Sequence, residues 1–276
     1  MILPIYSIPS PSTGEGEDEG VTSQDDPLSF NPLSQRKRKR KNKKGMNMEK
    51  AFVSWSGGKD CCQAAYQAIR QGIEINYLLN TVTADKNRSC SHGLSARWIK
   101  LQSEALGIPV IQQATAGDNY EAMFIDAILK LKREGITTGV FGDIDFEPHR
   151  EWIQRVCEKA AVRPVLPLWQ KNQMQIATDF IDLGFVSVVI ATQADLLAEE
   201  WLGRKFDTGF LNELSAYNAG ISPCGEAGEF HTLVIDGPLF KKRIEILETE
   251  KVKRDNHWFL DIQKCALVPS SFRGMQ

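Results

Sequence analysis

The chain has 276 residues, more than the commonest domain, so we expect one large domain or two modest ones. Its hydrophobic content of 42% is enough for a packed core, and no apolar run approaches the roughly 20 residues of a membrane span. A net charge of −2, with the more acidic share beyond residue 48, disfavours a nucleic-acid-binding surface.

The first 48 residues differ in composition from the rest. They are rich in Ser, Pro and Gly and carry eight basic and six acidic side chains, including a basic block at 36–44. Such a segment cannot bury enough apolar surface to offset its ordering entropy, so residues 1–48 are predicted to be a disordered basic tail. The block is a solvated extension, a nucleic-acid-binding arm or a nuclear address.

Cysteine usage and the N-terminus both favour a cytoplasmic protein. The six cysteines are scattered and none forms a CxxC pair, which is typical of reduced thiols rather than of disulfides or a zinc site. The chain does not start with basic residues followed by an apolar segment, so we do not expect secretion.

Residues 50–141 alternate between strand and helix patterns. Strands are predicted at 51–55, 75–82, 109–113 and 139–141, and helices at 60–71, 94–106 and 120–134. Repeated strand–helix units indicate a parallel sheet with right-handed crossovers. Ligands of such sheets bind at the carboxyl ends of the strands.

The remaining chain mixes helices with antiparallel signals. Helices are predicted at 149–160, 172–183 and 206–218, β-structure at 185–192 and 232–235, and a hairpin from 244–253 and 257–262. We therefore predict a first domain over residues 49–145 and a smaller α+β domain over 146–268.

A strand, a tight turn and a helix meet at Ser56-Gly57-Gly58-Lys59-Asp60. Two adjacent glycines permit positive φ, so that backbone N–H groups and the following helix N-terminus can form an anion site. Asp60 can cap the helix or ligate Mg2+. The candidate nucleotide-binding residues are Ser54, Ser56, Gly57, Gly58, Lys59 and Asp60.

The spacing excludes two common phosphate-binding motifs. A Walker A loop would have a glycine where Val53 stands and a Ser or Thr in place of Asp60, and no Rossmann G-x-G-x-x-G occurs here. The plain alternative is a β-turn with a surface lysine.

A second glycine-rich motif, residues 224–232, contains three ionisable groups. Glu226, Glu229 and His231 could hold Mg2+, bind ammonium or act as a base on it. A solvated loop is the alternative, and zinc is disfavoured because four ligands are lacking. Asp143, Asp145 and His149 could equally ligate a metal, touch substrate or cap a helix, so their role stays open.

Taken together, the segments 54–60 and 224–232 resemble the diphthine–ammonia ligase family of N-type ATP pyrophosphatases, and the resemblance covers about residues 49–265. It implies a HUP-type, Rossmann-like α/β nucleotide domain (49–145, the PP-loop ATP-binding domain) with a smaller C-terminal α+β substrate domain. It also implies amide formation: ATP adenylates a carboxylate, pyrophosphate leaves and ammonia displaces AMP. In that family the acceptor is diphthine, a modified histidine of elongation factor 2.

The resemblance implies ATP and Mg2+ as cofactors. Lys59, Glu226, Glu229 and His231 would then be catalytic, and Asp60 would ligate the metal. The chain departs from the family at Cys61, usually Ser, and at His231, where an acidic residue is expected.

Several alternatives stay open at this point. The His231 form resembles relatives that have been associated with cobalamin metabolism, which would make the chain an ATP pyrophosphatase of unknown acceptor. A PP-loop tRNA-modifying enzyme and a non-catalytic nucleotide sensor are the other readings. The oligomeric state is open too, with a homodimer as one alternative.

Overall fold

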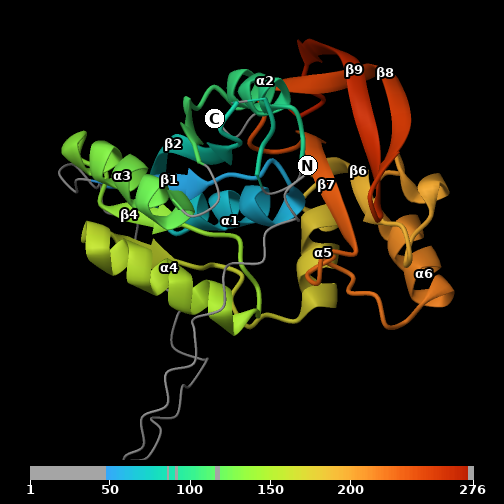
Figure 1. The fold of residues 1–276 in the computed structure, drawn as a ribbon, viewed down its shortest axis with the longest axis horizontal. Coiled ribbons are helices and arrows are strands. Elements are labelled where there is room, and N and C mark those ends of the chain that lie inside the picture. Colours follow the sequence, from blue (N-terminus) through green and yellow to red (C-terminus); the bar gives the residue numbers. More distant parts are fainter. Residues whose placement is uncertain (1–47, 86, 91–92, 116–118, 273–276) are drawn as a thin grey trace, which may run out of the picture. The chain divides into compact units, whose positions relative to one another are not determined.

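The computed structural model describes residues 48–85, 87–90, 93–115 and 119–272, which belong to one compact unit (Figure 1). Apart from Met48, the predicted tail lies outside the described residues. Within them, no helix combines the length and the apolar character that crossing a membrane requires.

The first part of the unit is a five-stranded sheet in the order β3-β2-β1-β4-β5, with every pair parallel. Its strands are β1 (Glu49–Ser54), β2 (Ile73–Val82), β3 (Val110–Ala114), β4 (Thr138–Val140) and β5 (Arg163–Val165). The connecting helices are α1 (Lys59–Arg70), α2 (Ala96–Leu106), α3 (Tyr120–Arg133) and α4 (Glu147–Ala160). This order is that of a Rossmann-like fold, which confirms the predicted fold class.

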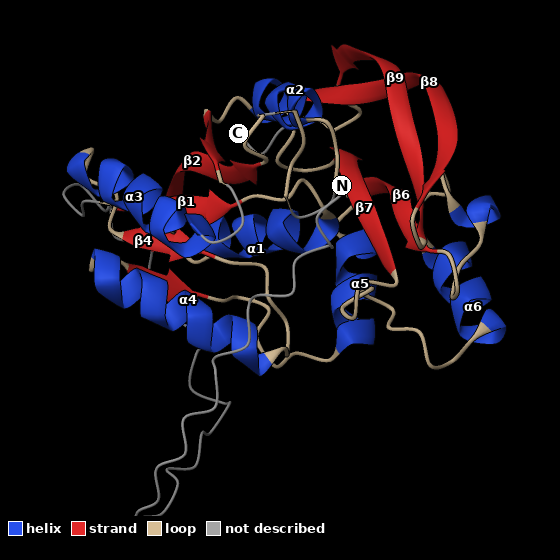
Figure 2. Ribbon diagram, viewed as in Figure 1, coloured by secondary structure: helices blue, strands red, loops and turns tan. Residues whose placement is uncertain are grey.

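The handedness of the crossovers decides which helix covers which face. The chain moves from β1 to β3 in one direction and returns through β4 to β5, so α3 and α4 cover the face opposite α1 and α2. Figure 2 shows α3 and α4 side by side, and the rings of Phe124 and Trp152 join them with centroids 5.0 Å apart. Trp152 is therefore a packing residue.

The second part is an antiparallel sheet in the order β7-β6-β9-β8 (Figure 2). Its strands are β6 (Val186–Gln193), β7 (Phe230–Asp236), β8 (Lys242–Arg254) and β9 (His257–Pro269), accompanied by α5 (Gln173–Asp182), the short 3-10 helix η2 (Glu199–Trp201) and α6 (Thr208–Tyr217). Side-chain caps start two of these helices: Asn172 accepts the N–H of Gln175, and Asp207 accepts that of Phe210.

Two predicted limits differ most from the structure. The hairpin strands β8 and β9 each have 13 residues, because their pairing continues to Pro269 beyond the apolar pattern. β5 pairs with β4, so the parallel sheet continues beyond residue 145, where the sequence pattern places the domain boundary. Pro164 is compatible with β5 because this strand lies at the sheet edge. We propose that the boundary between the two halves lies between Val165 and α5.

The two halves are joined at β7. The N–H of Val234 donates to the carbonyl of Gly57, 3.0 Å away, and one core cluster contains residues of both sheets, including Val53 of β1 and Phe230 of β7. Because β7 reaches the loop at the carboxyl end of β1, residues of both halves meet at the edge where ligands bind in α/β sheets.

Candidate active site

The loop after β1, residues 55–60, is called the glycine loop below. Gly57 has a φ of +90°, and a Cβ there would lie 2.7 Å from Ile99 Cδ1 and 2.8 Å from Gln102 Oε1. Only glycine fits both the dihedral and the space. The sequence therefore predicted the turn correctly, but not the neighbours that require it.

A second glycine brings the loop after β4 onto the start of α1. A Cβ on Gly142 would lie 2.7 Å from the carbonyl carbon of Asp60 and from the N of Cys61. This close approach carries Asp143 toward Asp60, so the carboxyl ends of β1 and β4 form one site.

β7 fastens the glycine loop from the other half. The N–H of Lys59 donates to Thr232 Oγ1 at 3.1 Å, next to the bond from Val234 to Gly57. The motif 224–232 contains Thr232, but nothing in its sequence indicates this contact. One N–H that an anion site could use is thus occupied by a hydroxyl in this structure.

The Lys59 side chain is held by protein groups and is 4% exposed. Its Nζ donates to the carbonyl of Cys224 and lies 2.9 Å from Asp60 Oδ2. It also lies over the rings of Phe206 and Phe230, 5.7 and 5.5 Å from their centroids. Burial works to lower the pKa of Lys59, but the nearby negative charge, above all Asp60, outweighs it and raises the pKa. Lys59 therefore stays cationic.

Asp60 offers an oxygen that fits a metal ion. Burial raises the pKa of its carboxyl, against the attraction of Lys59. Its Oδ1 is buried and has no hydrogen-bond partner of normal geometry among the described residues. In those residues no group of three or more His, Cys, Asp or Glu side chains is arranged to hold a metal. Mg2+ typically takes few protein ligands and completes its shell with water and phosphate, so this one oxygen is compatible with it.

Glu226 carries the strongest sign of acid–base function. Burial, then repulsion from Asp60, raises the pKa of its carboxyl to about 7; Lys59 opposes this, and Asp143 and Asp145 add to it. A carboxyl with this pKa exchanges its proton near neutral pH. The structure thus brings Lys59, Asp60 and Glu226 together, as the two motifs suggested.

Glu229 has a different position. It is 5% exposed, and its two oxygens accept the N–H groups of Ser222 and Ala227, each at 2.9 Å. Its carboxylate therefore shapes residues 222–229, called the acidic loop below, and both oxygens face that loop.

His231 lies on the other face of β7. Successive side chains of a strand point to opposite faces, and Phe230 and Thr232 are the neighbours that reach Lys59. Burial, followed by the charges of Lys59 and His257, lowers the pKa of His231 to about 4. The imidazole is therefore neutral at pH 7.

A chain of polar contacts links the loop after β4 to the acidic loop. Gln173 Nε2 donates to Asp145 Oδ2 at 2.6 Å, and Ser222 Oγ donates to Gln173 Oε1. The same hydroxyl accepts the N–H of Glu226 at 3.2 Å. Sequence reasoning missed Gln173 and Ser222 because neither belongs to a charged cluster. In the same loop after β4, Asp143 Oδ1 lies 3.0 Å from His149 Nδ1.

Cys61 replaces the serine expected in this loop. Its Sγ donates to the carbonyl of Gly58 at 3.2 Å, a bond that a serine could also make. Burial raises the pKa of the thiol, as it does for Cys62, so neither side chain is an activated nucleophile.

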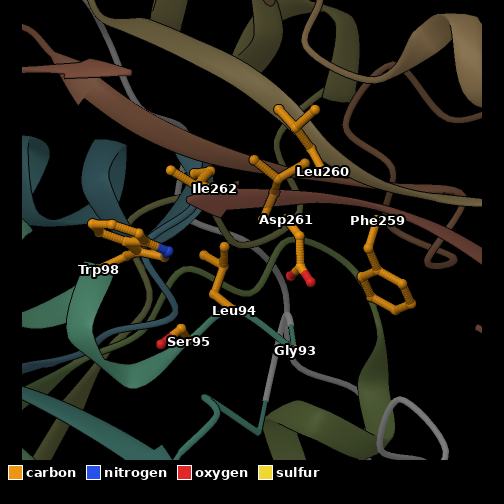
Figure 3. A pocket seen from close by; sticks show the side chains of 9 residues that line it. Gly93, Leu94, Ser95, Trp98, Phe259, Leu260, Asp261 and Ile262 are labelled. Carbon is orange, nitrogen blue, oxygen red and sulfur yellow. The ribbon is translucent and has the colours of Figure 1, made fainter. Parts of the chain in front are cut away.

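Two hollows lie away from the glycine loop. Figure 3 shows one between the start of α2 and β9, lined by Trp98 and Phe259 among others. Its volume is about 10 Å³, room for a water molecule. The other, of about 540 Å³, lies between β6, β7, β8 and β9 and is lined by Lys205 and Arg243 among others. Neither is lined by a residue of the glycine loop.

The fold and the site define a class: a Rossmann-like PP-loop protein whose nucleotide loop is completed by an antiparallel second half. Residues 49–164 match the family model described as the diphthamide synthase N-terminal domain, and residues 172–268 match the diphthamide synthase C-terminal domain. The chain belongs to the diphthamide synthase family.

Curated relatives agree with this assignment. The chain is similar to the diphthine–ammonia ligase of Danio rerio, with 29% identity over 231 residues that cover 75% of this chain and 90% of the relative. It is similar to that of Homo sapiens, with 30% identity over 227 residues, 71% of this chain and 82% of the relative. A solved structure titled as a predicted subunit of tRNA methyltransferase from Methanocaldococcus jannaschii covers 67% of this chain and 96% of its own, with 17% identity and a TM-score of 0.37.

Proposed function

We propose that this protein is an AMP-forming, ATP-dependent ligase that converts the carboxylate of diphthine on elongation factor 2 into an amide, with ammonia as the nitrogen donor. Its family and its relatives named diphthine–ammonia ligase support an ATP-dependent amide ligase. The identity of the acceptor, the use of Mg2+, the cytoplasmic location and a homodimer are the finer parts of this proposal.

One observation carries the chemistry: a carboxyl with a pKa of about 7, Glu226, lies within electrostatic reach of the buried pair formed by Lys59 and Asp60. A cation at a helix N-terminus suits phosphates, and a proton acceptor beside it suits an amine nucleophile.

In the first half-reaction the acceptor carboxylate attacks the α-phosphate of ATP, and pyrophosphate leaves. Lys59 and the glycine loop stabilise the charge on the leaving group from a preorganised, largely buried position. Asp60 Oδ1 would hold Mg2+, which supplies further positive charge beside the phosphates.

In the second half-reaction ammonia attacks the activated carbonyl, and AMP leaves. Attack needs the neutral amine, whereas ammonium predominates at pH 7, so a base is required. Glu226 takes this proton. Glu229 holds the acidic loop in shape, and we assign it a positioning role. His231, neutral at pH 7, adds no positive charge that would repel ammonium.

The test combines product analysis with a defined acceptor. The purified protein is incubated with ATP, Mg2+, ammonium and diphthine-bearing elongation factor 2. AMP, pyrophosphate and the mass change from carboxyl to carboxamide are then measured. AMP formation that depends on the acceptor is the expected result. Strong stimulation by RNA would instead favour a tRNA-modifying enzyme, and ATP binding without AMP would contradict a ligase.

A further inference from the structure

Gln102 of α2 lies outside both sequence motifs, yet it contacts both halves of the site. The side chain is 0% exposed. Its Oε1 accepts the indole N–H of Trp55 at 3.0 Å, and its Nε2 donates to the carbonyls of Gly57 at 2.9 Å and Val234 at 2.8 Å. Both amide hydrogens and the amide oxygen are therefore used.

These bonds determine the orientation of one peptide group. The carbonyl of Gly57 accepts two hydrogen bonds, from Gln102 and from the N–H of Val234. In a trans peptide the N–H points opposite to the C=O, so fixing the carbonyl of Gly57 toward α2 and β7 also fixes the N–H of Gly58 on the opposite side. In this structure that N–H donates to Ser56 Oγ, 3.4 Å away within the glycine loop.

Without Gln102, only the bond from Val234 restrains the carbonyl of Gly57. Gly57 and Gly58 lack side chains, so little steric resistance opposes a flip. A flipped peptide would present a carbonyl, not an N–H, to an anion. Packing alone does not explain a glutamine here, because burying an amide is costly unless each polar atom is bonded and an apolar side chain would fill the space.

We propose that Gln102 is a positioning residue that holds the peptide between Gly57 and Gly58 with its N–H toward the nucleotide phosphates. It does so by tying the glycine loop to β7. This assignment rests on the proposed function, which makes ATP the ligand of the glycine loop. Gln102 itself acts through the backbone.

The variant Gln102→Met tests the assignment, because methionine fills a similar volume and donates no hydrogen bond. Gln63→Met is the matched control. Gln63 is also a 0% exposed helical glutamine, and its Nε2 donates to a carbonyl of the other half, that of Ile176, at 3.1 Å. The hydrogen bond that the Gln63 side chain donates goes to Ile176 and not to the glycine loop, so both variants lose a buried amide and only Gln102→Met affects the peptide.

We expect both variants to lose thermal stability. Only Gln102→Met should lower kcat/KM for ATP–pyrophosphate exchange, by about 100-fold, the lower end of the loss seen when one preorganised donor is removed. The indole ¹⁵N–H resonance of Trp55 should shift in Gln102→Met alone. An exchange rate of Gln102→Met that equals the rate of Gln63→Met would overturn the proposal.

Two further measurements keep the outcome decisive. If Gln102→Met does not fold, Gln102→Glu keeps an acceptor for Trp55 and removes the amide donors, and the same loss is expected. If the wild type binds ATP but does not catalyse ATP–pyrophosphate exchange, the proposed ligase function fails. The role of Gln102 is then tested by the Kd for ATP, which should rise in the Gln102 variants and not in Gln63→Met. A wild type that neither binds nor exchanges ATP contradicts both.

Discussion

The glycine loop and the acidic loop are both short, glycine-containing and charged, but the structure treats their charges in opposite ways. Burial works to lower the pKa of Lys59, but Asp60 and the other negative groups nearby outweigh it, so Lys59 stays a cation. Glu226 has more acidic neighbours than basic ones, and its pKa rises to about 7. In the proposed reaction, one loop thus provides fixed charge for phosphates, and the other provides a group that exchanges protons.

The largest effect is expected from Lys59→Met, which removes the fixed charge. ATP–pyrophosphate exchange should fall by at least about 100-fold, since a preorganised electrostatic contact is lost. Isotope exchange between pyrophosphate and ATP measures this.

The control for Lys59→Met is the double variant with Asp60→Asn. Removing Lys59 alone leaves Asp60 without its cation, a change that destabilises buried pairs, whereas the double variant leaves no such charge. The double variant should be more stable in thermal unfolding and equally inactive. An active double variant would show that Lys59 only balances Asp60.

Glu226→Gln removes the proton-exchanging group and should separate the two half-reactions. Exchange should persist, while amide formation falls by about 100-fold, a typical contribution of a general base. In the wild type, amide formation should rise with pH through about 7, because the carboxylate is the active form. In Glu226→Gln this rise with pH should be absent. An equal loss in both assays would place Glu226 with the nucleotide instead.

Glu229→Gln should have a smaller effect than Glu226→Gln. The carboxamide keeps one acceptor and turns an NH2 toward an N–H donor of its own loop, which costs on the order of 1–3 kcal/mol of stability. Thermal unfolding should show this loss of stability, and the rate of amide formation should still rise with pH through about 7. Loss of that rise would mean that Glu229 is itself the base.

The smallest effect is a pH dependence of stability. The folded pKa of Glu226, about 7, exceeds its ordinary value of 4.5, so the unfolded state loses its proton first as pH rises. Stability that Glu226 contributes is present below pH 4.5 and is lost as pH rises through about 7. The difference in Tm between Glu226→Gln and wild type should grow over this window and then level off. A constant difference would contradict the raised pKa.

Particular residues show which features of the site short stretches of sequence could predict. The strand, turn and helix around Lys59 were predictable, because periodicity and glycine dihedrals act over a few residues. The closeness of Lys59 and Glu226 was suggested only by the resemblance of two motifs. Thr232 and Gln102 could not be assigned, since their contacts with the glycine loop span 173 and 45 positions.

By itself the sequence determined the alternating α/β order, the glycine turn after the first strand and the charged groups available for chemistry, since these depend on neighbours along the chain. Only the tertiary structure decided that β5 completes the parallel sheet, that β7 fastens the glycine loop and that the Glu229 carboxylate accepts hydrogen bonds from its own loop. The reason is physical: hydrogen bonds between distant segments and the burial that shifts a pKa exist only once the chain has packed.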